Sequence, residues 1–546
     1  MKFSNLYRNQ FVEEAQAAQF DLLVIGGGIT GCGIALDAAL RGLKVALIEK
    51  NDFASGTSSR STKLIHGGLR YLKQLEFKLV HDVGSERAVV HRNARHIVIP
   101  EKMLLPILED GSLGTFSTSI GLMVYDLLAG VKKSERRVML DKHDTLKEEP
   151  LLAGDKLVGG GLYFEYRTDD SRLVIELAKS AFAKGALLLN YTESKHFIYD
   201  GQQRITGVKV HDKINNREFE IKATTVVNAC GPWVDLLRKE DNSLRGKRLQ
   251  LTKGVHLVFP YEKLPIKQAA YFDVGDGRMI FAITRNKITY VGTTDTVYNQ
   301  DLNKPHCSKE DAQYLLDAVN KMFPTVNLKQ EDIISTWAGL RPLIFEEGKS
   351  ASELSRKDEI MISPSGLISI AGGKLTGYRL MAEKIVDLVG KKRGKNFGDC
   401  RTKNFRLSGG EFENEEAFQI SLGELIAKGE ADNIPLDKIS EWFFRYGTNT
   451  ASVIAKVAAL RADIQNTEQL FEAAELFYAI EHEMVYYLND FLIRRTGKIF
   501  FDIKNSEKQM DYLASLLAQK LNQDTVLVQQ GLESTKEEFH SAVSFS

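Results

Sequence analysis

Three glycines near the N-terminus have the spacing that binds the phosphates of a dinucleotide. Gly26, Gly28 and Gly31 follow the short apolar run DLLVI at 21–25 and precede the segment GIALDAALRG. Such glycines allow a tight turn, a close approach of the backbone to phosphate, and close packing of the helix that follows. The N-terminus of that helix adds partial positive charge. The pattern therefore predicts a strand, a nucleotide-binding turn and a helix.

A carboxylate at the end of the next apolar segment narrows the class of nucleotide. Glu49 lies near the end of LKVALIEK, roughly 20 residues beyond the glycines, where a carboxylate accepts hydrogen bonds from free ribose hydroxyls and repels a 2′-phosphate. Residues 21–50 therefore form one predicted βαβ unit that binds FAD or NAD. The hydroxyl- and glycine-rich segment TSSRSTKLIHGGLRYLK at 57–73 favours FAD, because a plain nicotinamide domain does not need it.

The segments that must position these residues indicate two kinds of sheet. Apolar runs at 204–212, 223–231 and 366–373 predict further strands, and the last two end in glycine. Residues 250–340 contain alternating segments such as VHLVF, MIFAI and ITYVGTT, which predict an antiparallel sheet in an inserted domain. From about residue 395 the pattern becomes helical, and the last residues, STKEEFHSAVSFS, are predicted to form a loose tail.

The composition excludes several classes of protein. Lys plus Arg and Asp plus Glu each total 72 in 546 residues, so no net charge draws the chain to nucleic acid. The four cysteines lack CxxC spacing, which is typical of a reducing compartment and not of a zinc or disulfide framework. Histidines near carboxylates lack metal-ligand spacing, so we expect no metal. No uncharged run approaches the ~20 residues of a membrane-spanning helix, and we expect a cytoplasmic protein.

Several motifs, in order along the chain, resemble those of one family. They are GGGITG, DFASGTSSRSTKLIHGGLRYL, NACGPW at 228–233, GLRPL at 339–343 and AGGKLTGYR at 371–379. Together they resemble the FAD-dependent, respiratory (aerobic) glycerol-3-phosphate dehydrogenases over nearly the whole chain. RYGTNTASV at 445–453 and FLIRRTGKIFFD at 491–502 resemble the helical cap domain of that family.

This resemblance implies an α/β fold with three domains. A Rossmann-like FAD-binding domain of the glutathione-reductase and amino-acid-oxidase type would be discontinuous, comprising residues 18–95, 160–248 and 340–394. An antiparallel-sheet substrate domain would comprise 96–159 and 249–339, and a C-terminal helical cap domain 395–546. The isoalloxazine ring would lie between the first two domains.

The cofactor implied is FAD, bound by the glycine turn, by Glu49 and by three further segments. The contacts implied there are Ser58, Ser59, Thr62, Lys63, Leu64, Ala229, Gly231, Gly372 and Thr376. From the residues alone, Gly372 ends an apolar strand and precedes a helical segment, so a helix N-terminus could face the flavin and stabilise negative charge. The alternative is a strand-to-helix turn that only caps the helix.

The reaction implied is oxidation of sn-glycerol 3-phosphate to dihydroxyacetone phosphate. Hydride would pass from C2 to flavin N5, and the electrons would continue to a membrane quinone. By resemblance, the substrate-binding residues are Arg70, Tyr71, Arg341, Arg356 and Lys374. Guanidinium groups bind phosphate oxygens two at a time, and lysine adds a point charge. Without the family, an arginine in such a place is more often part of a surface ion pair.

Two histidines are candidates for the base that takes the hydroxyl proton. His66 in LIHGG and His256 in KGVHLVF lie in segments that match the family, and an unperturbed histidine has a pKa near ~6.5. Taken alone, a histidine is more often a packed or surface imidazole. Arg341 could instead stabilise the developing alkoxide, which would leave no histidine obligatory. We interpret Trp233 and Tyr378 as core aromatics without a catalytic role.

Three other functions stay open at this point. A glycerophosphate oxidase, which passes electrons to dioxygen, shares every motif but carries an additional insertion in the later half. An amine or amino-acid oxidase on the same scaffold would need no phosphate-binding cluster. A flavin-carrying interaction module would use the helical domain to bind a partner. We expect the dehydrogenase, as a homodimer, with a peripheral contact on the inner face of the cell membrane through basic patches such as KKRGK at 391–395.

Overall fold

A sheet with a parallel centre is built around the predicted glycine turn. The computed structural model describes residues 1–66, 77–109, 111, 136–345 and 357–545. In these residues the first sheet has eight strands in the order β17-β18-β10-β1-β2-β7, with β9 beside β10 and β8 beside β9. The strands are β1 (Gln19–Ile25), β2 (Val45–Ile48), β7 (Leu187–Leu189), β8 (Thr192–Tyr199), β9 (Ile205–Asp212), β10 (Arg217–Asn228), β17 (Asp358–Ile362) and β18 (Ile368–Gly372). Because β1 pairs in parallel with β2 and β10, the carboxyl ends of these strands meet at one edge.

Three helices pack together beside this sheet. They are α2 (Ile29–Leu40), α7 (Asp170–Ala183) and α10 (Tyr378–Arg393), and α2 contacts both others. Small residues on α2 permit the close approach, since a Cβ on Gly33 would lie 2.9 Å from the ring of Tyr378. Tyr378 is buried in the core of this region, as predicted. The shorter helices α1 (Arg8–Ala17) and α8 (Val234–Glu240) and the longer α4 (Phe77–Asn93) complete the helices here.

The second sheet is mostly antiparallel and has ten strands in the described residues. They are β3 (Leu64–Ile65), β4 (Val98–Leu108), β5 (Val138–Asp141), β6 (Leu157–Thr168), β11 (Leu249–Pro260), β12 (Ala269–Asp273), β13 (Met279–Arg285), β14 (Ile288–Gly292), β15 (Thr296–Val297) and β16 (Ser335–Ile344). Alternate residues of β11 enter different cores. Val255 and Leu257 pack in the core that contains α9 (Lys309–Met322), and Val258 packs in the core shared with the C-terminal helices. A short helix, α6 (Lys142–Glu148), joins β5 to β6.

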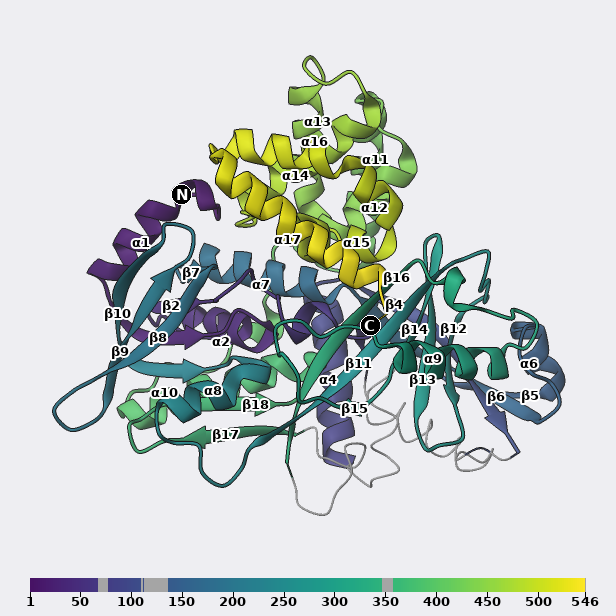
Figure 1. Ribbon diagram of the computed structural model, residues 1–546, viewed down its shortest axis with the longest axis horizontal. Helices are drawn as coiled ribbons and strands as arrows, with labels where there is room; N and C mark the ends of the chain where they lie inside the picture. The colour runs from purple at the N-terminus through teal and green to yellow at the C-terminus, as the bar shows by residue number, and fades with distance from the viewer. Residues whose placement is uncertain (67–76, 110, 112–135, 346–356, 546) are drawn as a thin grey trace.

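The C-terminal region is helical, as predicted, and lies above both sheets (Figure 1). Its elements are α11 (Glu415–Ala431), α12 (Leu436–Tyr446), α13 (Thr450–Leu460), α14 (Thr467–His482), a π-helical turn η9 (Asp490–Arg495), α15 (Lys498–Phe501), α16 (Ile503–Leu521) and α17 (Thr525–Val543). None of the helices in the described part of the chain is long and apolar enough to cross a membrane.

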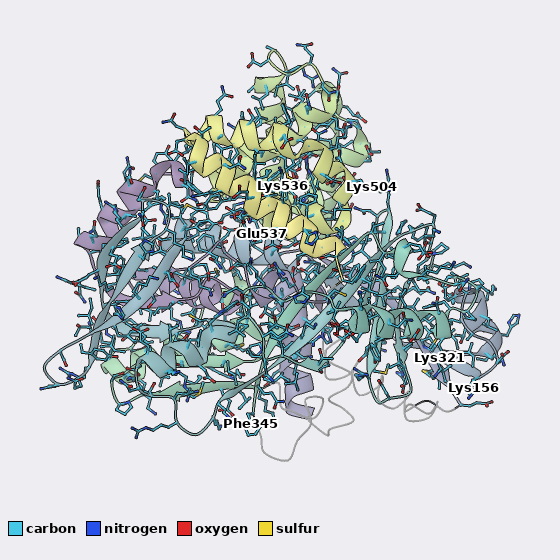
Figure 2. The ribbon with its side chains drawn as sticks, viewed as in Figure 1. Lys156, Lys321, Phe345, Lys504, Lys536 and Glu537 are labelled. Carbon is cyan, nitrogen blue, oxygen red and sulfur yellow. The ribbon has the colours of Figure 1, made fainter. Side chains whose placement is uncertain are left out.

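The prediction of a loose C-terminal tail is wrong, because α17 continues to Val543. Phe539 and Ala542 are buried between this helix and the second sheet, so the end of the chain has an apolar face that anchors it. Ion pairs add to the contact: Glu538 pairs with Arg60 at 3.1 Å. Glu537, which is labelled in Figure 2, pairs with Lys304 at 3.1 Å. Phe539 and Ala542 have the spacing of one helix face, but the segment has too few apolar residues to form a long periodic pattern in the sequence.

Sheet membership differs from the predicted domain ranges at three places. The short strand β3 falls in the predicted range 18–95, yet it pairs with β6 in the second sheet. Most of β6 falls in the predicted FAD-binding range 160–248, yet β6 pairs with β4 along its length in the second sheet. The end of β16 falls in the predicted range 340–394 but pairs with β11 in the same sheet. β6 and β16 carry glycine beside apolar residues, a pattern that also marks nucleotide-binding strands. The division into three domains stays a proposal, with 64–65, 157–168 and 335–344 moved to the second sheet.

Candidate functional site

A cavity of about 530 Å³ lies where the two sheets meet. It is lined by the turn after β1, the loop after β2, the ends of β10 and β18, and residues of β11 and β16. Of the predicted site residues, those that line it are Gly26, Gly28, Glu49, Ser58, Thr62, Leu64, His66, Ala229, Gly231, His256, Arg341, Gly372, Lys374 and Thr376. Residues from the two sheets therefore share one site.

The glycine turn has no room for side chains. Gly26 has a φ of +115°, and a Cβ there would lie 2.5 Å from the carbonyl oxygen of Ala229. A Cβ on Gly31 would lie 1.8 Å from the carbonyl oxygen of Gly26, so α2 packs directly on the turn. Gly28 is the N-cap of α2 and supplies no side-chain cap, while the Ile29 amide donates to the Ser58 hydroxyl at 3.1 Å. The helix N-terminus thus faces the cavity with polar donors, as phosphate binding requires.

Glu49 is held rigidly at the wall of the cavity. Its Oε2 accepts a hydrogen bond from the Gly27 amide at 2.7 Å, and its Oε1 accepts one from the Asn51 amide at 2.9 Å. Burial raises the pKa of Glu49, and these two backbone hydrogen bonds oppose that shift. A carboxylate fixed in this way retains acceptor lone pairs for hydroxyl groups in the cavity.

A second glycine turn faces the same cavity. Gly372 and Gly373 both have a positive φ, +76° and +77°, at the end of β18. A Cβ on Gly372 would lie 2.5 Å from the carbonyl oxygen of Lys357. The turn leads through a short 3₁₀ segment, in which Thr376 donates to the His66 carbonyl oxygen at 3.3 Å, to the N-terminus of α10. The predicted glycine turn therefore also positions the backbone of His66.

His256 and Arg341 lie on one face of the β11–β16 ladder. In this ladder His256 pairs with Trp337, and Thr252 pairs with Arg341. The imidazole stacks on the Trp337 indole with ring centroids 4.7 Å apart, and its Nε2 lies 3.0 Å from the Thr62 hydroxyl. Its Nδ1 is buried and has no hydrogen-bond partner among the described residues. Burial lowers the pKa of His256 well below its ordinary value, and the charges of Arg341 and Lys63 add to the effect.

Arg341 is oriented by a short polar segment after β14. Its guanidinium donates to the Thr293 hydroxyl at 2.9 Å and to the Thr294 carbonyl oxygen at 3.1 Å, and it pairs with Asp295 at 3.2 Å. A Cβ on Gly254 would lie 2.2 Å from Nη2, so only glycine leaves space for this guanidinium. Arg341 is thus part of the cavity wall and not a surface ion pair.

Three predicted cofactor contacts do not line the cavity. Gly31 belongs to α2 and packs against the backbone of Gly26. The Ser59 hydroxyl donates to the Gly56 carbonyl oxygen at 3.4 Å. The Lys63 ammonium is buried, pairing with Asp170 at 2.6 Å. These residues support the loops that carry the lining residues. Three predicted substrate contacts, Arg70, Tyr71 and Arg356, lie outside the described residues.

Several lining residues were not predicted. Lys50, Arg60 and Arg278 bring additional positive charge to the cavity. Trp233, interpreted from sequence as core, also lines it, with the Lys50 ammonium 4.0 Å from its ring centroid. Lys50 directly follows Glu49, and Arg60 lies within TSSRSTK. Their positions beside predicted cofactor contacts could therefore have predicted that they line the cavity. No pattern in the sequence near Arg278 predicted that it lines the cavity, because its position depends on the pairing of β12 with β13.

Comparison with known proteins identifies the family. The model of the FAD dependent oxidoreductase family matches residues 21–379, and that of the C-terminal domain of alpha-glycerophosphate oxidase matches residues 400–526. The aerobic glycerol-3-phosphate dehydrogenases of Staphylococcus aureus strains RF122 and USA300 are 49% identical, over 99% of this chain and 98% of theirs. The chain belongs to the FAD-dependent glycerol-3-phosphate dehydrogenase family.

Solved structures agree with this assignment. The crystal structure of the glycerol-3-phosphate dehydrogenase from Bacillus halodurans complexed with FAD has a TM-score of 0.86 and 42% identity, covering 99% of both chains. The L-alpha-glycerophosphate oxidase from Mycoplasma pneumoniae shares the fold, with a TM-score of 0.54 and 18% identity over 68% of this chain. The predicted α/β class and the FAD cofactor are therefore confirmed. The glycine turn, the N-terminus of α2 and Glu49 fit the phosphates and ribose of that cofactor.

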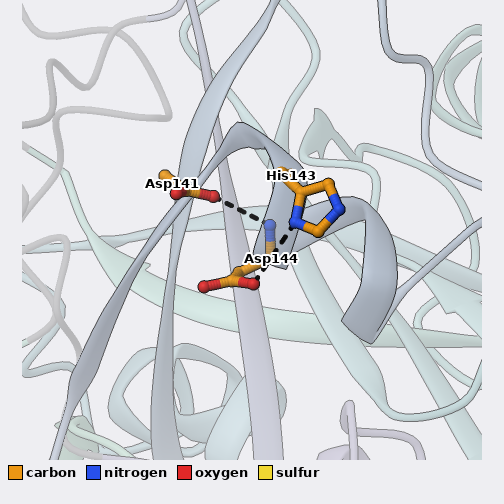
Figure 3. Close-up of side chains that lie close together, drawn as sticks. All are labelled: Asp141, His143 and Asp144. Atoms are coloured by element: carbon orange, nitrogen blue, oxygen red, sulfur yellow. Dashed lines mark hydrogen bonds and ion pairs between the residues drawn. The ribbon is translucent and has the colours of Figure 1, made fainter.

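One cluster outside the cavity has side chains of metal-ligand type. Asp141, His143 and Asp144 lie together at the start of α6 and are exposed (Figure 3). Asp141 caps this helix by accepting a hydrogen bond from the Asp144 amide at 2.8 Å, and His143 lies 3.5 Å from the Asp144 carboxylate. Capping of a short surface helix accounts for the cluster.

Proposed function

We propose that this protein oxidises sn-glycerol 3-phosphate to dihydroxyacetone phosphate. The observation that carries the proposal is that one cavity joins the dinucleotide turn to Arg341, Lys374 and two histidines. FAD, when bound, supplies the hydride acceptor, N5 of the flavin. The chain must then bind a phosphate ester, orient its C2 hydroxyl and remove the hydroxyl proton.

Cations in the cavity provide for binding of the substrate. Arg341 and Lys374 line it, and Arg70, Tyr71 and Arg356 remain predicted contacts. Because Thr293 and Asp295 already orient the Arg341 guanidinium, little conformational entropy is lost when an anion binds. Its positive charge also favours the ionised form of a nearby hydroxyl, as the transition state requires.

The two histidines differ in their capacity to take a proton. His256 is almost fully buried and its pKa is depressed, so an imidazolium there would be costly. His66 also lines the cavity and is only partly buried, with its ring edge-on to Phe281 at 6.0 Å. We therefore propose His66 as the general base and His256 as a neutral imidazole that orients the hydroxyl.

The electron acceptor in this proposal is a membrane quinone. The high identity to dehydrogenases over 99% of the chain supports it. An oxidase that forms hydrogen peroxide is the second candidate, favoured by the match of residues 400–526 to the glycerophosphate oxidase C-terminal domain. The same proposal includes a homodimer and peripheral attachment to the inner face of the cell membrane, with the basic end of α10 as a candidate contact.

An anaerobic titration tests cofactor and substrate together. Glycerol 3-phosphate should bleach the flavin absorbance stoichiometrically, and glycerol alone should not. The reduced enzyme is then mixed with a soluble quinone analogue or with air-saturated buffer. Faster reoxidation by the quinone is expected. Rapid reoxidation by air with peroxide formation would support the oxidase and contradict the dehydrogenase. A flavin that is not bleached would contradict both functions.

A further inference from the structure

The loop after Glu49 wraps around the glycine turn. The Asn51 amide donates to the Glu49 carboxylate at 2.9 Å, and the Ala54 amide donates to the Gly27 carbonyl oxygen at 3.0 Å. Ala54 has a φ of +63°, an uncommon conformation for a residue with a side chain. Between them lies Asp52, whose side chain is fully buried. The geometry of Glu49 and of the turn therefore depends on what holds Asp52.

Two successive arginines from the C-terminal helical region hold Asp52. Arg495 donates from Nη1 to Oδ2 at 2.7 Å and from Nη2 to Oδ1 at 2.9 Å, which is a bidentate contact. Arg494 donates from Nε to Oδ2 at 2.6 Å. Both arginines belong to the π-helical turn η9, in the motif FLIRRTG that the proposed reaction does not use. Turns of this type are rare and occur often at functional sites.

The contact extends beyond the three charged side chains. Arg495 also donates to the Glu483 carbonyl oxygen at 2.6 Å. Asn190 donates to Asp52 at 3.1 Å and to the Met484 carbonyl oxygen at 2.9 Å, so it joins the two regions independently. Burial raises the pKa of Asp52, but Arg495 and Arg494 lower it by more, and the carboxyl group stays ionised. Each charge in this cluster is therefore buried and paired.

We propose that Arg494 and Arg495 are positioning residues for FAD. By clamping Asp52 they hold the loop from Glu49 to Ala54 against the glycine turn, so the C-terminal helical region forms part of the cofactor site. A released Asp52 would free the loop and with it the Glu49 carboxylate. This inference rests on the proposed function only in placing the FAD ribose at Glu49.

The rate of FAD release from the purified holoenzyme tests the clamp. Free FAD is more fluorescent than bound FAD, and far-UV circular dichroism on the same samples reports folding. In Asp52→Asn we expect FAD to dissociate at least about tenfold faster, equivalent to about 1.4 kcal/mol of binding free energy, while the dichroism stays native. Arg495→Lys keeps the charge but loses the planar fork, so a smaller acceleration is expected.

A matched variant separates positioning from general stability. Glu472 pairs with Lys498 at 2.6 Å, and both are buried in the same helical region. Their described hydrogen bonds and ion pairs do not reach the loop from Glu49 to Ala54. Glu472→Gln should lower the unfolding temperature without accelerating FAD release from the folded enzyme. Equal release rates in Asp52→Asn and Glu472→Gln would overturn the inference. If Asp52→Asn does not fold, Arg494→Gln, which leaves both Arg495 bonds, takes its place with the same criterion.

A variant of the glycine turn distinguishes failure of the inference from failure of the proposed site. Gly28→Val places a branched side chain at the cavity, with its Cβ 3.2 Å from the Ser58 hydroxyl, and should abolish FAD binding. Loss of FAD in Gly28→Val with normal release in Asp52→Asn would reject the clamp alone. Normal FAD binding in both variants would reject the proposed cofactor site.

Discussion

At the scale of single residues, Arg341 and His256 show how neighbouring groups divide the chemistry. Arg341 keeps its charge and is oriented by Thr293 and Asp295. That charge helps to keep His256 neutral, so the buried imidazole can exchange hydrogen bonds without becoming a cation. This difference in burial is the reason why we propose the less buried His66 for proton transfer.

Replacing Arg341 by lysine should separate charge from geometry. Lysine retains the positive charge but has a single nitrogen in place of the planar fork that donates to Thr293 and Thr294. Because a hydrogen bond to a charged group contributes about 1.5–3 kcal/mol, we expect kcat/KM for glycerol 3-phosphate to fall roughly 10- to 100-fold. Steady-state kinetics measure this, with the exposed Arg204→Lys as the control. An unchanged kcat/KM would contradict the proposed role of Arg341 in substrate binding.

The two histidines predict different pH profiles when each is replaced by asparagine. His66→Asn should lower kcat by about 10²- to 10⁴-fold and abolish the acidic limb of the pH profile, because the base is lost. His256→Asn should lower kcat less and leave that limb in place, since a neutral orienting group does not titrate there. Pre-steady-state flavin reduction across the pH range gives both profiles. The reverse pattern would assign the base to His256.

At the scale of elements, the packing of α2 on the glycine turn decides whether the turn can exist. The Cβ of any other residue at position 31 would meet backbone, which cannot move aside as a side chain can. The same element therefore serves the core and the cofactor at once. Gly254 on β11 differs from Gly31, because a Cβ there would meet the side chain of Arg341 and not the backbone.

Gly31→Ala should consequently destabilise the protein and weaken FAD binding. Overpacking in a dense core destabilises by about 1–3 kcal/mol, and the shift of α2 moves its N-terminus away from the cofactor. Chemical denaturation and FAD titration measure the two effects. Gly423→Ala is the matched control, because it is also a helical glycine but has open space around it. It should be neutral or stabilising, as alanine favours helix.

At the scale of the whole molecule, buried neutral histidines make stability depend on pH. His96 is buried against Gly409 and Gly447 of the C-terminal region, and neither ring nitrogen has a partner among the described residues. Burial lowers its pKa well below the ordinary value, and the charges of Arg172 and Lys179 add to this. The helical region thus packs on a group that resists protonation.

The sign of the pH effect follows from proton binding. Unfolded histidine has a pKa near ~6.5 and folded His96 a lower one, so below ~6.5 the unfolded state binds more protons. The stabilisation is present above that pH and is lost on acidification, by up to about 1.4 kcal/mol per pH unit for each such histidine. We expect His96→Gln to lose less stability than the natural chain between pH ~7.5 and ~5.5. Urea denaturation measures this, and the exposed His143→Gln should keep the original slope.

Much of the nucleotide site could be predicted because its residues are close in sequence and each has a local reason. The glycine turn, Glu49 and the second turn at Gly372 depend on strand-to-helix geometry that glycine and apolar runs reveal. The roles of Lys63 and Asp52 could not be predicted in this way. Their partners, Asp170 and the two arginines of η9, come from remote segments, and a buried ion pair leaves no periodic pattern in either segment.

The same limit explains the misplaced strand and tail. β6 has the glycines and apolar residues of a nucleotide-binding strand, and only its pairing with β4 assigns it to the second sheet. The last part of α17 has few apolar residues, and Phe539 is buried because the second sheet lies beneath it. Tertiary contacts, and not local propensity, determine the sheet to which β6 belongs and the burial of the end of α17.

The clamp on Asp52 also sets an order of events during synthesis of the chain. Asp52 and Arg494 are separated by 442 positions. At translation rates of about 5–20 residues per second, the ribosome needs roughly 20–90 s to make the intervening chain. During that interval the nascent loop carries a carboxylate that has not met its arginines. In our proposal, stable capture of the cofactor therefore has to wait until Arg494 and Arg495 have emerged from the ribosome.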